Sequence, residues 1–224
     1  MVFILLALAS QLPGWWAIWQ LRRHNRPRPD LPGGGGEFAA WLLKRHGLTA
    51  QVRVEAHDGP DHYDPVTRTV RLSRAYYATP SLTALAVAAH EVAHAHQHLT
   101  GDEAFLERMT LIERARWLHR LAGGALLAAP VLTVLAHTPA AAALSFTAGF
   151  IAMGVPVLIH LRTFTVEWDA SFNHALPWLV ETGRFDVADQ RALKRVLRAC
   201  AWTYAAQSLA SLFNLWRWLS PARH

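Results

Sequence analysis

Charged residues are scarce in this chain, and cysteine is almost absent. Only 17% of the 224 residues are charged, against roughly 25% in ordinary soluble domains, and 52% are hydrophobic. This composition favours a protein that spends part of its length in a membrane, and the chain length excludes two large soluble domains. The single cysteine, Cys200, excludes an intramolecular disulfide, so the chain gives no internal sign of an oxidising compartment.

Long basic stretches are also lacking, although the net charge is +6. Lysine and arginine occur in short flanks beside apolar runs rather than along one face, so nucleic acid is not an expected partner. Many of the ten tryptophans lie where apolar runs end, at 15–19 and 216–218, as rings at the lipid headgroup level do. A soluble core could also hold them. We expect a lipid bilayer and a protein or peptide substrate near the membrane as partners.

The apolar runs predict membrane spans. Residues 2–19 carry no charge and precede four arginines, so we interpret the first segment as a retained anchor with its N-terminus outside the cell. Residues 121–136 and 140–161 predict a transmembrane hairpin with both ends in the cytosol, and two buried helices of a soluble protein are the alternative. The run at 199–216 contains enough polar residues to be either a fourth span or a packed helix.

A small cytosolic unit of helices and strands is predicted between the anchor and the hairpin. Apolar spacing predicts a helix over 37–46, and alternation of apolar and polar residues predicts short strands at 52–55 and 70–73. Ser81 is placed to cap a long alanine-rich helix that extends to about Leu99. A charged helix over 103–120 follows.

The expected organisation has six segments. They are an N-terminal anchor (1–21), a basic and Pro/Gly-rich linker (22–36), a cytosolic part with the long helix (37–120), a transmembrane hairpin (121–161), further cytosolic helices (162–198) and a C-terminal apolar helix (199–224).

The alanine-rich helix contains the motif His90-Glu91-Val92-Ala93-His94. Two histidines four residues apart project from one helix face and can bind a single zinc ion. Glu91 lies beside them, where it can act as the general base that activates a water for attack on a carbonyl. A solvated surface with two histidines is the alternative, but such a charged group would be costly to bury in an alanine-rich packing face.

A catalytic zinc needs a third protein ligand. The metzincin pattern is excluded because Thr100 stands where its third histidine would be, and His96 and His98 are interpreted as polar residues rather than ligands. Four glutamates remain as candidates: Glu103, Glu107, Glu113 and Glu167. The first three have arginine neighbours and suit surface ion pairs. Glu167 lies in an otherwise apolar neighbourhood, where an unpaired carboxylate needs a partner such as a metal.

Four ordered motifs resemble the YugP-type bacterial membrane zinc metallopeptidases. They are Asp61-His62-Tyr63-Asp64-Pro65, Val70-Arg71-Leu72-Ser73, the segment from His90 to Gln97, and Glu167-Trp168-Asp169-Ala170-Ser171. The resemblance covers nearly the whole chain. It implies a zincin fold with Glu167 as the third zinc ligand. In the wider class an acidic residue follows the glutamate by four positions, but here that position is Ser171 and the acidic residue is Asp169, so either could orient a zinc-binding histidine.

The segment 61–65 has two interpretations. Asp64-Pro65 after Gly59-Pro60 is typical of a tight turn, whereas His62 and Tyr63 are donors that could stabilise the oxyanion of a tetrahedral intermediate. The strand at 70–73 precedes the zinc helix, where zincins present an edge strand to the substrate backbone.

We therefore expect a mainly α integral membrane protein with a small α+β zincin-like catalytic unit, made of a short β-hairpin and the zinc helix. The expected function is a membrane-bound zinc metalloendopeptidase, with zinc bound by His90, His94 and Glu167 and with Glu91 as general base. The expected location is the bacterial inner membrane, with several spans and the catalytic part in the cytosol. The alternative is a non-hydrolytic membrane scaffold with a structural zinc, which would need a fourth protein ligand.

Overall fold

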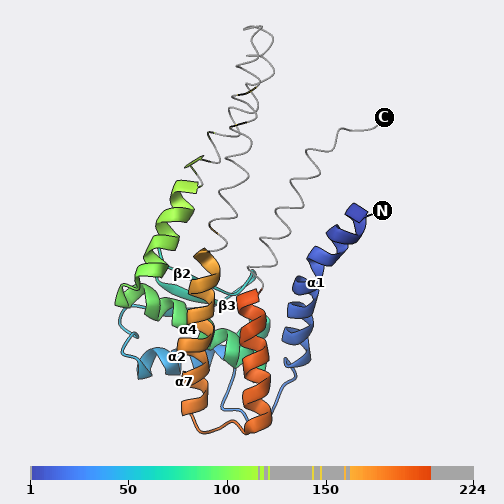
Figure 1. Ribbon diagram of the computed structural model, residues 1–224. Helices are drawn as coiled ribbons and strands as arrows, with labels where there is room; N and C mark the ends of the chain where they lie inside the picture. The colour runs from blue at the N-terminus through green and yellow to red at the C-terminus, as the bar shows by residue number, and fades with distance from the viewer. Residues whose placement is uncertain are drawn as a thin grey trace.

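The computed structural model describes residues 2–115, 117, 118, 121, 143, 147, 159 and 162–202. The named elements are α1 (Val2–Arg23), α2 (Gly35–Arg45), β1 (Arg53–His57), β2 (His62–Asp64), β3 (Thr69–Ser73), α3 (Arg74–Ala78), α4 (Leu82–Thr100), the π-helix η1 (Ala170–Ala175) and α7 (Leu176–Glu181) (Figure 1). Residues 103–115, 162–169 and 187–202 are also helical.

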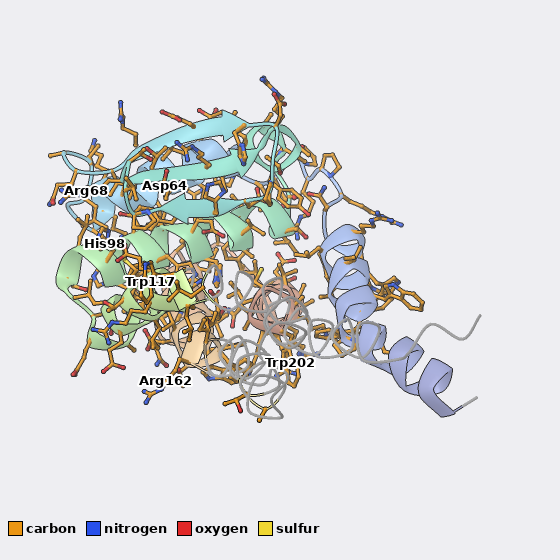
Figure 2. The ribbon with its side chains drawn as sticks, turned by 90° about the horizontal axis from the view of Figure 1, so that it is seen from above. Asp64, Arg68, His98, Trp117, Arg162 and Trp202 are labelled. Carbon is orange, nitrogen blue, oxygen red and sulfur yellow. The ribbon has the colours of Figure 1, made fainter. Side chains whose placement is uncertain are left out.

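Helix α4 is the centre of the fold. One side of it packs on the sheet and on α2, and another side packs on η1 and α7 (Figures 1 and 2). Fifteen of its nineteen residues are buried, and its many alanines allow this close approach from several directions. Apolar side chains from all these layers form one core that includes Leu42, Leu72, Leu85, Leu179 and Leu197.

The termini of α4 follow the sequence signals. The Ser81 hydroxyl accepts a hydrogen bond from the Ala84 amide at 3.1 Å, as expected of an N-cap. Gly101 ends the helix in a left-handed conformation with φ of 74°, which a residue without Cβ adopts without strain. The long helix predicted from Ser81 to about Leu99 is therefore confirmed.

The sheet differs from the predicted hairpin. Its strand order is β1-β3-β2, with β1 parallel to β3 and β2 antiparallel to it. The segments at 52–55 and 70–73 therefore do not form a hairpin with each other. β2 lies on residues for which a tight turn was one of the two interpretations, and it supplies the antiparallel partner of β3. β3 is the central strand, so the expectation that 70–73 is an edge strand was wrong, and β2 is an edge.

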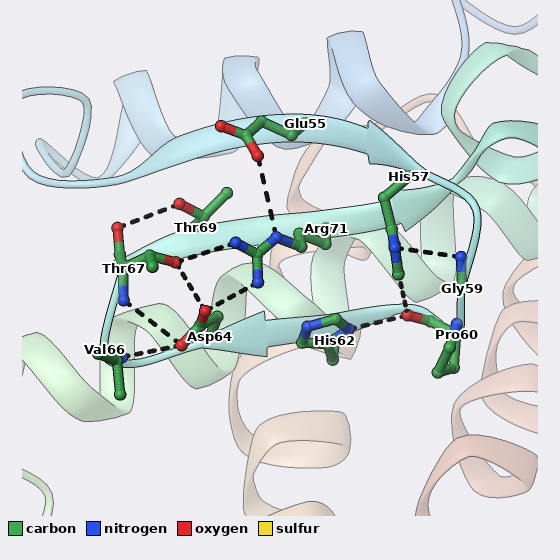
Figure 3. Close-up of polar contacts among 10 residues, drawn as sticks. All are labelled: Glu55, His57, Gly59, Pro60, His62, Asp64, Val66, Thr67, Thr69 and Arg71. Carbon is green, nitrogen blue, oxygen red and sulfur yellow. Dashed lines mark hydrogen bonds and ion pairs between the residues drawn. The ribbon is translucent and has the colours of Figure 1, made fainter.

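A polar network fixes the turn between β2 and β3 (Figure 3). Asp64 accepts hydrogen bonds from the Val66 amide at 2.9 Å and the Thr67 hydroxyl at 2.7 Å. It also pairs with Arg71 at 2.8 Å, and Arg71 lies 3.9 Å from Glu55 on β1. Asp64 thus joins the edge strand β2 to the turn and to β3, and Arg71 extends the network to β1.

The integral-membrane part of the predicted fold class was wrong. Among the described residues, no helix combines the length and apolar character that a bilayer span requires. The apolar run of α1 contains the polar pair Ser10-Gln11 and Pro13, and only one face of its C-terminal half packs on the protein, while Trp15 and Trp19 are more than half exposed. Ala17 and Gln20 are buried there, and the carbonyl of Leu21 accepts a hydrogen bond from the Thr83 hydroxyl at 2.8 Å.

Other predicted segments cannot be compared with the structure. The hairpin at 121–161 lies outside the described residues, apart from residues 121, 143, 147 and 159, and so does 203–224 of the C-terminal run. The proposed six-segment organisation stays a prediction.

The four-glycine run allows backbones to approach closely. α2 begins at Gly35, inside the segment that the sequence suggested as a linker. A Cβ at Gly35 would lie 2.7 Å from the carbonyl oxygen of Tyr76 and 2.9 Å from that of Ala84. At Gly36 it would lie 2.6 Å from the Tyr77 ring. The glycines therefore seat the start of α2 against α3 and α4.

Candidate metal centre

The two motif histidines lie side by side in the middle of α4. Their ring centroids are 4.6 Å apart, and the residues are only 3% and 5% exposed. The spacing of four residues places them on one helix face, as predicted. The packing of α4 on both sides removes them from solvent.

Glu167 meets both histidines from a distant part of the sequence. Its Oε2 atom lies 3.0 Å from Nε2 of His90 and 3.2 Å from Nε2 of His94, and the residue is fully buried. The three side chains form a group whose candidate ligand atoms all lie within 4.8 Å of one another. The helix at 162–169 thus brings the predicted third ligand to the predicted histidines.

Which nitrogen of the His90 ring carries the proton decides whether His90, His94 and Glu167 can bind a cation. The Ser171 hydroxyl donates to the Leu197 carbonyl at 3.3 Å, so towards the ring it acts as an acceptor, 3.1 Å from Nδ1 of His90. A neutral ring that donates from Nδ1 has no proton on Nε2, which then presents a lone pair to Glu167.

Zinc fits this arrangement. Nitrogen and oxygen lone pairs face one another across 3.0–3.2 Å, which is repulsive without a cation between them. Zn–N and Zn–O bonds of about 2.0–2.2 Å in a tetrahedral site would separate neighbouring ligand atoms by roughly 3.3 Å, close to these distances.

Each histidine has a different group behind it. Nδ1 of His90 meets Ser171, whereas Nδ1 of His94 lies 2.9 Å from Oε1 of Gln97. The amide nitrogen of Gln97 donates to Asp169 at 2.8 Å. Ser171 therefore contacts one histidine directly, and Asp169 reaches the other through a glutamine. The sequence left open which of the two residues orients a histidine, and the structure places each behind a different ring.

The π-helix η1 follows Glu167 and sets the positions of these partners. Asp169 contacts Asn173, four residues later, at 2.6 Å and His174, five residues later, at 3.2 Å. The wider π turn brings the fifth residue beside the first, and π-helical turns are frequent at functional sites. One short segment thus supplies Asp169, Ser171 and the groups that hold Asp169.

Glu91 adjoins this group without belonging to it. The residue is 7% exposed. Burial raises the pKa of its carboxyl to about 7, while His90 and a backbone hydrogen bond from Tyr63 oppose the rise. A carboxylate with a pKa near neutral pH is suited to accept and release a proton during a reaction.

Arg108 is a contact of Glu167 that the sequence did not indicate. Its guanidinium lies 3.3 Å from Oε1 of Glu167, the oxygen that does not face the histidines. Burial alone would raise the pKa of the Glu167 carboxyl, but without a metal a proton on Nε2 of His94 and His90 holds that pKa well below its usual value, so either a proton or a metal ion lies between the rings and the carboxylate. The ionised carboxylate is the form that binds a metal.

The two proposed oxyanion donors point to other partners. Nδ1 of His62 lies 2.8 Å from the Pro60 carbonyl, and its ring packs against His57 (Figure 3). The Tyr63 hydroxyl lies 2.9 Å from Nδ1 of His98, one turn beyond His94 on α4. The side chains of His62 and Tyr63 are therefore held near the centre but not in it.

His96 lies on a different face of α4 from the metal group. It packs with His46, His174 and Trp178, at ring-centroid distances of 5.0 to 6.0 Å. Its interpretation as a polar residue outside the ligand set agrees with this position.

Gln97 and Arg108 are the site residues that sequence reasoning missed. Gln97 had one available signal: it lies three residues after His94, on the same face of a helix otherwise rich in buried alanine. A polar residue at such a position needs a buried partner. No comparable signal exists for Arg108, because only tertiary packing brings it to Glu167.

Comparison with known proteins agrees with these features. The family described as "Putative neutral zinc metallopeptidase" matches residues 1–223. "Putative membrane protease YugP" of Bacillus subtilis is 32% identical over 230 residues, which span 98% of this chain and 96% of the relative. No solved structure matches. The resemblance drawn from the four motifs and the expectation of zinc as cofactor are both confirmed.

Proposed function

The chain belongs to this family of neutral zinc metallopeptidases, and from that premise we propose that it hydrolyses peptide bonds of its substrates with a zinc ion bound by His90, His94 and Glu167. The observation that carries the proposal is the convergence of two histidine nitrogens and one carboxylate oxygen in a buried group. His90, His94 and Glu167 are the proposed zinc ligands. Three protein ligands leave a coordination position for water or substrate, as catalytic zinc sites do.

Glu91 is the proposed general base. Zinc held by the three ligands would polarise the scissile carbonyl and lower the pKa of a water molecule. The Glu91 carboxylate takes a proton from the attacking water and passes it to the leaving amine. Its pKa of about 7 supports both steps, because the group can hold and release the proton near neutral pH.

The edge strand β2 is the proposed place for the substrate backbone. β2 pairs with β3 on one side, and the backbone of Tyr63 lies within hydrogen-bonding distance of Glu91. An extended peptide that adds to this edge would lie beside the general base. The proposed oxyanion role of His62 and Tyr63 requires their side chains to leave Pro60 and His98, their present partners.

The proposed substrates are proteins or peptides. The name of the Bacillus subtilis relative contains the words "membrane protease", which supports substrates that lie at or near a membrane. The metal-capable group among the described residues has three members, and Glu91 stands beside them. A structural zinc site would have a fourth protein ligand and no use for a base beside it, so these observations favour hydrolysis over a scaffold.

The experiment combines zinc content with peptidase activity in matched variants. Wild-type protein should bind about one zinc per chain and cleave an unstructured protein such as casein. Glu91→Gln should keep the zinc and lose the activity, whereas His90→Ala and His94→Ala should lose both. Equal zinc content in all four proteins would contradict the site. Full activity in Glu91→Gln would contradict the general base.

A further inference from the structure

Gln97 is one of the most deeply buried side chains of the protein, and the proposed chemistry leaves it without a role. It is 1% exposed, although its amide carries two donors and an acceptor. Burying such a group without partners costs several kcal/mol. All three functions are satisfied: Oε1 meets His94, and Nε2 meets both the Val166 carbonyl at 3.2 Å and Asp169.

These partners allow only one orientation of the amide. The Val166 carbonyl and the Asp169 carboxylate are both acceptors, so the NH₂ group of Gln97 must face them. Its oxygen must then face His94, and an oxygen can only accept. Nδ1 of His94 therefore carries a proton, and in the neutral ring Nε2 presents its lone pair to the position facing Glu167. One glutamine thus selects the tautomer that can bind a metal.

The same side chain reaches the third proposed ligand. Val166 directly precedes Glu167, so the bond from Gln97 to the Val166 carbonyl ties α4 to the backbone that carries Glu167. Asp169 in turn is held by Asn173 and His174. A carboxylate that accepts from the amide NH₂ makes the amide oxygen a stronger acceptor, and this increases the basicity of the histidine.

We propose that Gln97 is a positioning residue that connects Asp169 to His94, so that Asp169 acts on the metal centre only through the Gln97 amide. The inference rests on the proposed function for the identity of the metal. It differs from the arrangement at His90, where Ser171 links the ring to the neutral Leu197 carbonyl. The two histidines are therefore supported by unequal partners, and the one supported by a carboxylate is His94.

A double-mutant cycle on zinc affinity tests the connection. Gln97→Met keeps the side-chain volume but removes both polar functions, and Asp169→Asn removes only the charge. Zinc dissociation constants are measured on the full chain by competition with a chromophoric chelator. Gln97→Met should weaken zinc binding by about ten- to hundredfold, as loss of a partner behind a metal ligand does. Asp169→Asn should weaken it less.

The decisive comparison is the effect of Asp169→Asn in the two backgrounds. If Asp169 acts through Gln97, adding Asp169→Asn to Gln97→Met should change the dissociation constant by less than about twofold. A change of that size is within the error with which free energies of mutation usually add. An equal loss in both backgrounds would mean that the Asp169 charge acts directly, and the connection would be wrong. Wild-type affinity in Gln97→Met would overturn the proposal as a whole.

Tautomer and folding measurements separate positioning from general stability. The ¹⁵N resonances of the His94 ring in metal-free protein should indicate Nδ1–H in wild type, and the Nε2–H form should gain population in Gln97→Met. Gln190→Met is the matched control, because Gln190 donates to Phe185 far from the centre and should leave zinc binding unchanged. If Gln97→Met does not fold, Asp169→Asn alone decides: its side chain is one-third exposed, and unchanged affinity there would refute the connection.

Failure of the proposed function gives a different result. Wild-type protein that binds zinc but cleaves no peptide would refute the peptidase activity and leave the cycle readable. Wild-type protein that binds zinc, with additive effects in the cycle, would refute only the role of Gln97.

Discussion

The two oxygens of the Glu167 carboxylate face different partners. One oxygen faces the two histidines, and the other lies 3.3 Å from Arg108. Such a division favours binding of a metal through one oxygen only, because the guanidinium occupies the second. The carboxylate is ionised in either case, because a proton or a metal ion on the histidine side keeps the pKa of Glu167 well below its usual value.

Glu167→Gln tests this residue against another glutamate of the chain. The amide is neutral and binds zinc poorly, so we expect zinc affinity to fall by at least the ten- to hundredfold that follows loss of a supporting residue. Peptidase activity should be lost. Glu113→Gln is the control, because Glu113 is exposed on the helix at 103–115 and should change neither property. Loss of zinc in Glu113→Gln with retention in Glu167→Gln would reverse the assignment.

Site residues could be identified from the sequence where their partners are close to them along the chain. His90, Glu91 and His94 were found from helical spacing alone. Glu167 stood out because its carboxylate lies in an apolar segment, and the family resemblance then implied its role. Gln97 was missed as a functional residue, although it is close in sequence, because its partners Val166 and Asp169 come from a segment about 70 residues away.

The elements show the same division between local and distant relations. The start of α4 was predicted because Ser81 acts on its own helix, and the predicted end near Leu99 lies one residue before the observed end at Thr100. The parallel pairing of β1 with β3 was not predicted. It requires β2, which lies between them in sequence, to pair with the other edge of β3. The apolar run of α1 was interpreted as a span from its hydrophobicity, which does not reveal that Ala17 and Gln20 pack on the protein.

Gly35→Ala tests the role of the glycine run at the start of α2. Reduced freedom of the unfolded chain would by itself stabilise the protein by about 0.4–1 kcal/mol. The new methyl group would meet two backbone oxygens at 2.7 and 2.9 Å, and overpacking of this kind costs about 1–3 kcal/mol. We expect net destabilisation in urea unfolding. An increase in the free energy of unfolding would contradict the close packing.

A second substitution gives the control for this effect. A methyl group at Gly36 would meet the ring of Tyr77 rather than backbone. Tyr77→Ala should therefore reduce the cost of Gly36→Ala and leave the cost of Gly35→Ala unchanged, because the carbonyl oxygens stay in place. Equal rescue at both positions would indicate a general loosening of α2 instead.

At the scale of the molecule, the metal centre joins two parts of the chain. His94 and Glu167 are separated by 73 residues in the sequence, and their side chains approach to 3.2 Å. A bound zinc would hold α4 to the helix at 162–169, and the unfolded chain does not offer these ligands together. Ligands that bind only the folded state raise its stability in proportion to the logarithm of their concentration.

Zinc should therefore raise the melting temperature of the metal-free protein. At a free zinc concentration one hundred times the dissociation constant, the gain is about 2.7 kcal/mol. For a chain of this size that corresponds to a rise of roughly 5–10 °C, measured by circular dichroism. A chelator should reverse it. Glu91→Gln should show the full rise because it retains the ligands, whereas His94→Ala should show almost none. A rise in His94→Ala equal to that of wild type would mean that zinc stabilises the protein at another place.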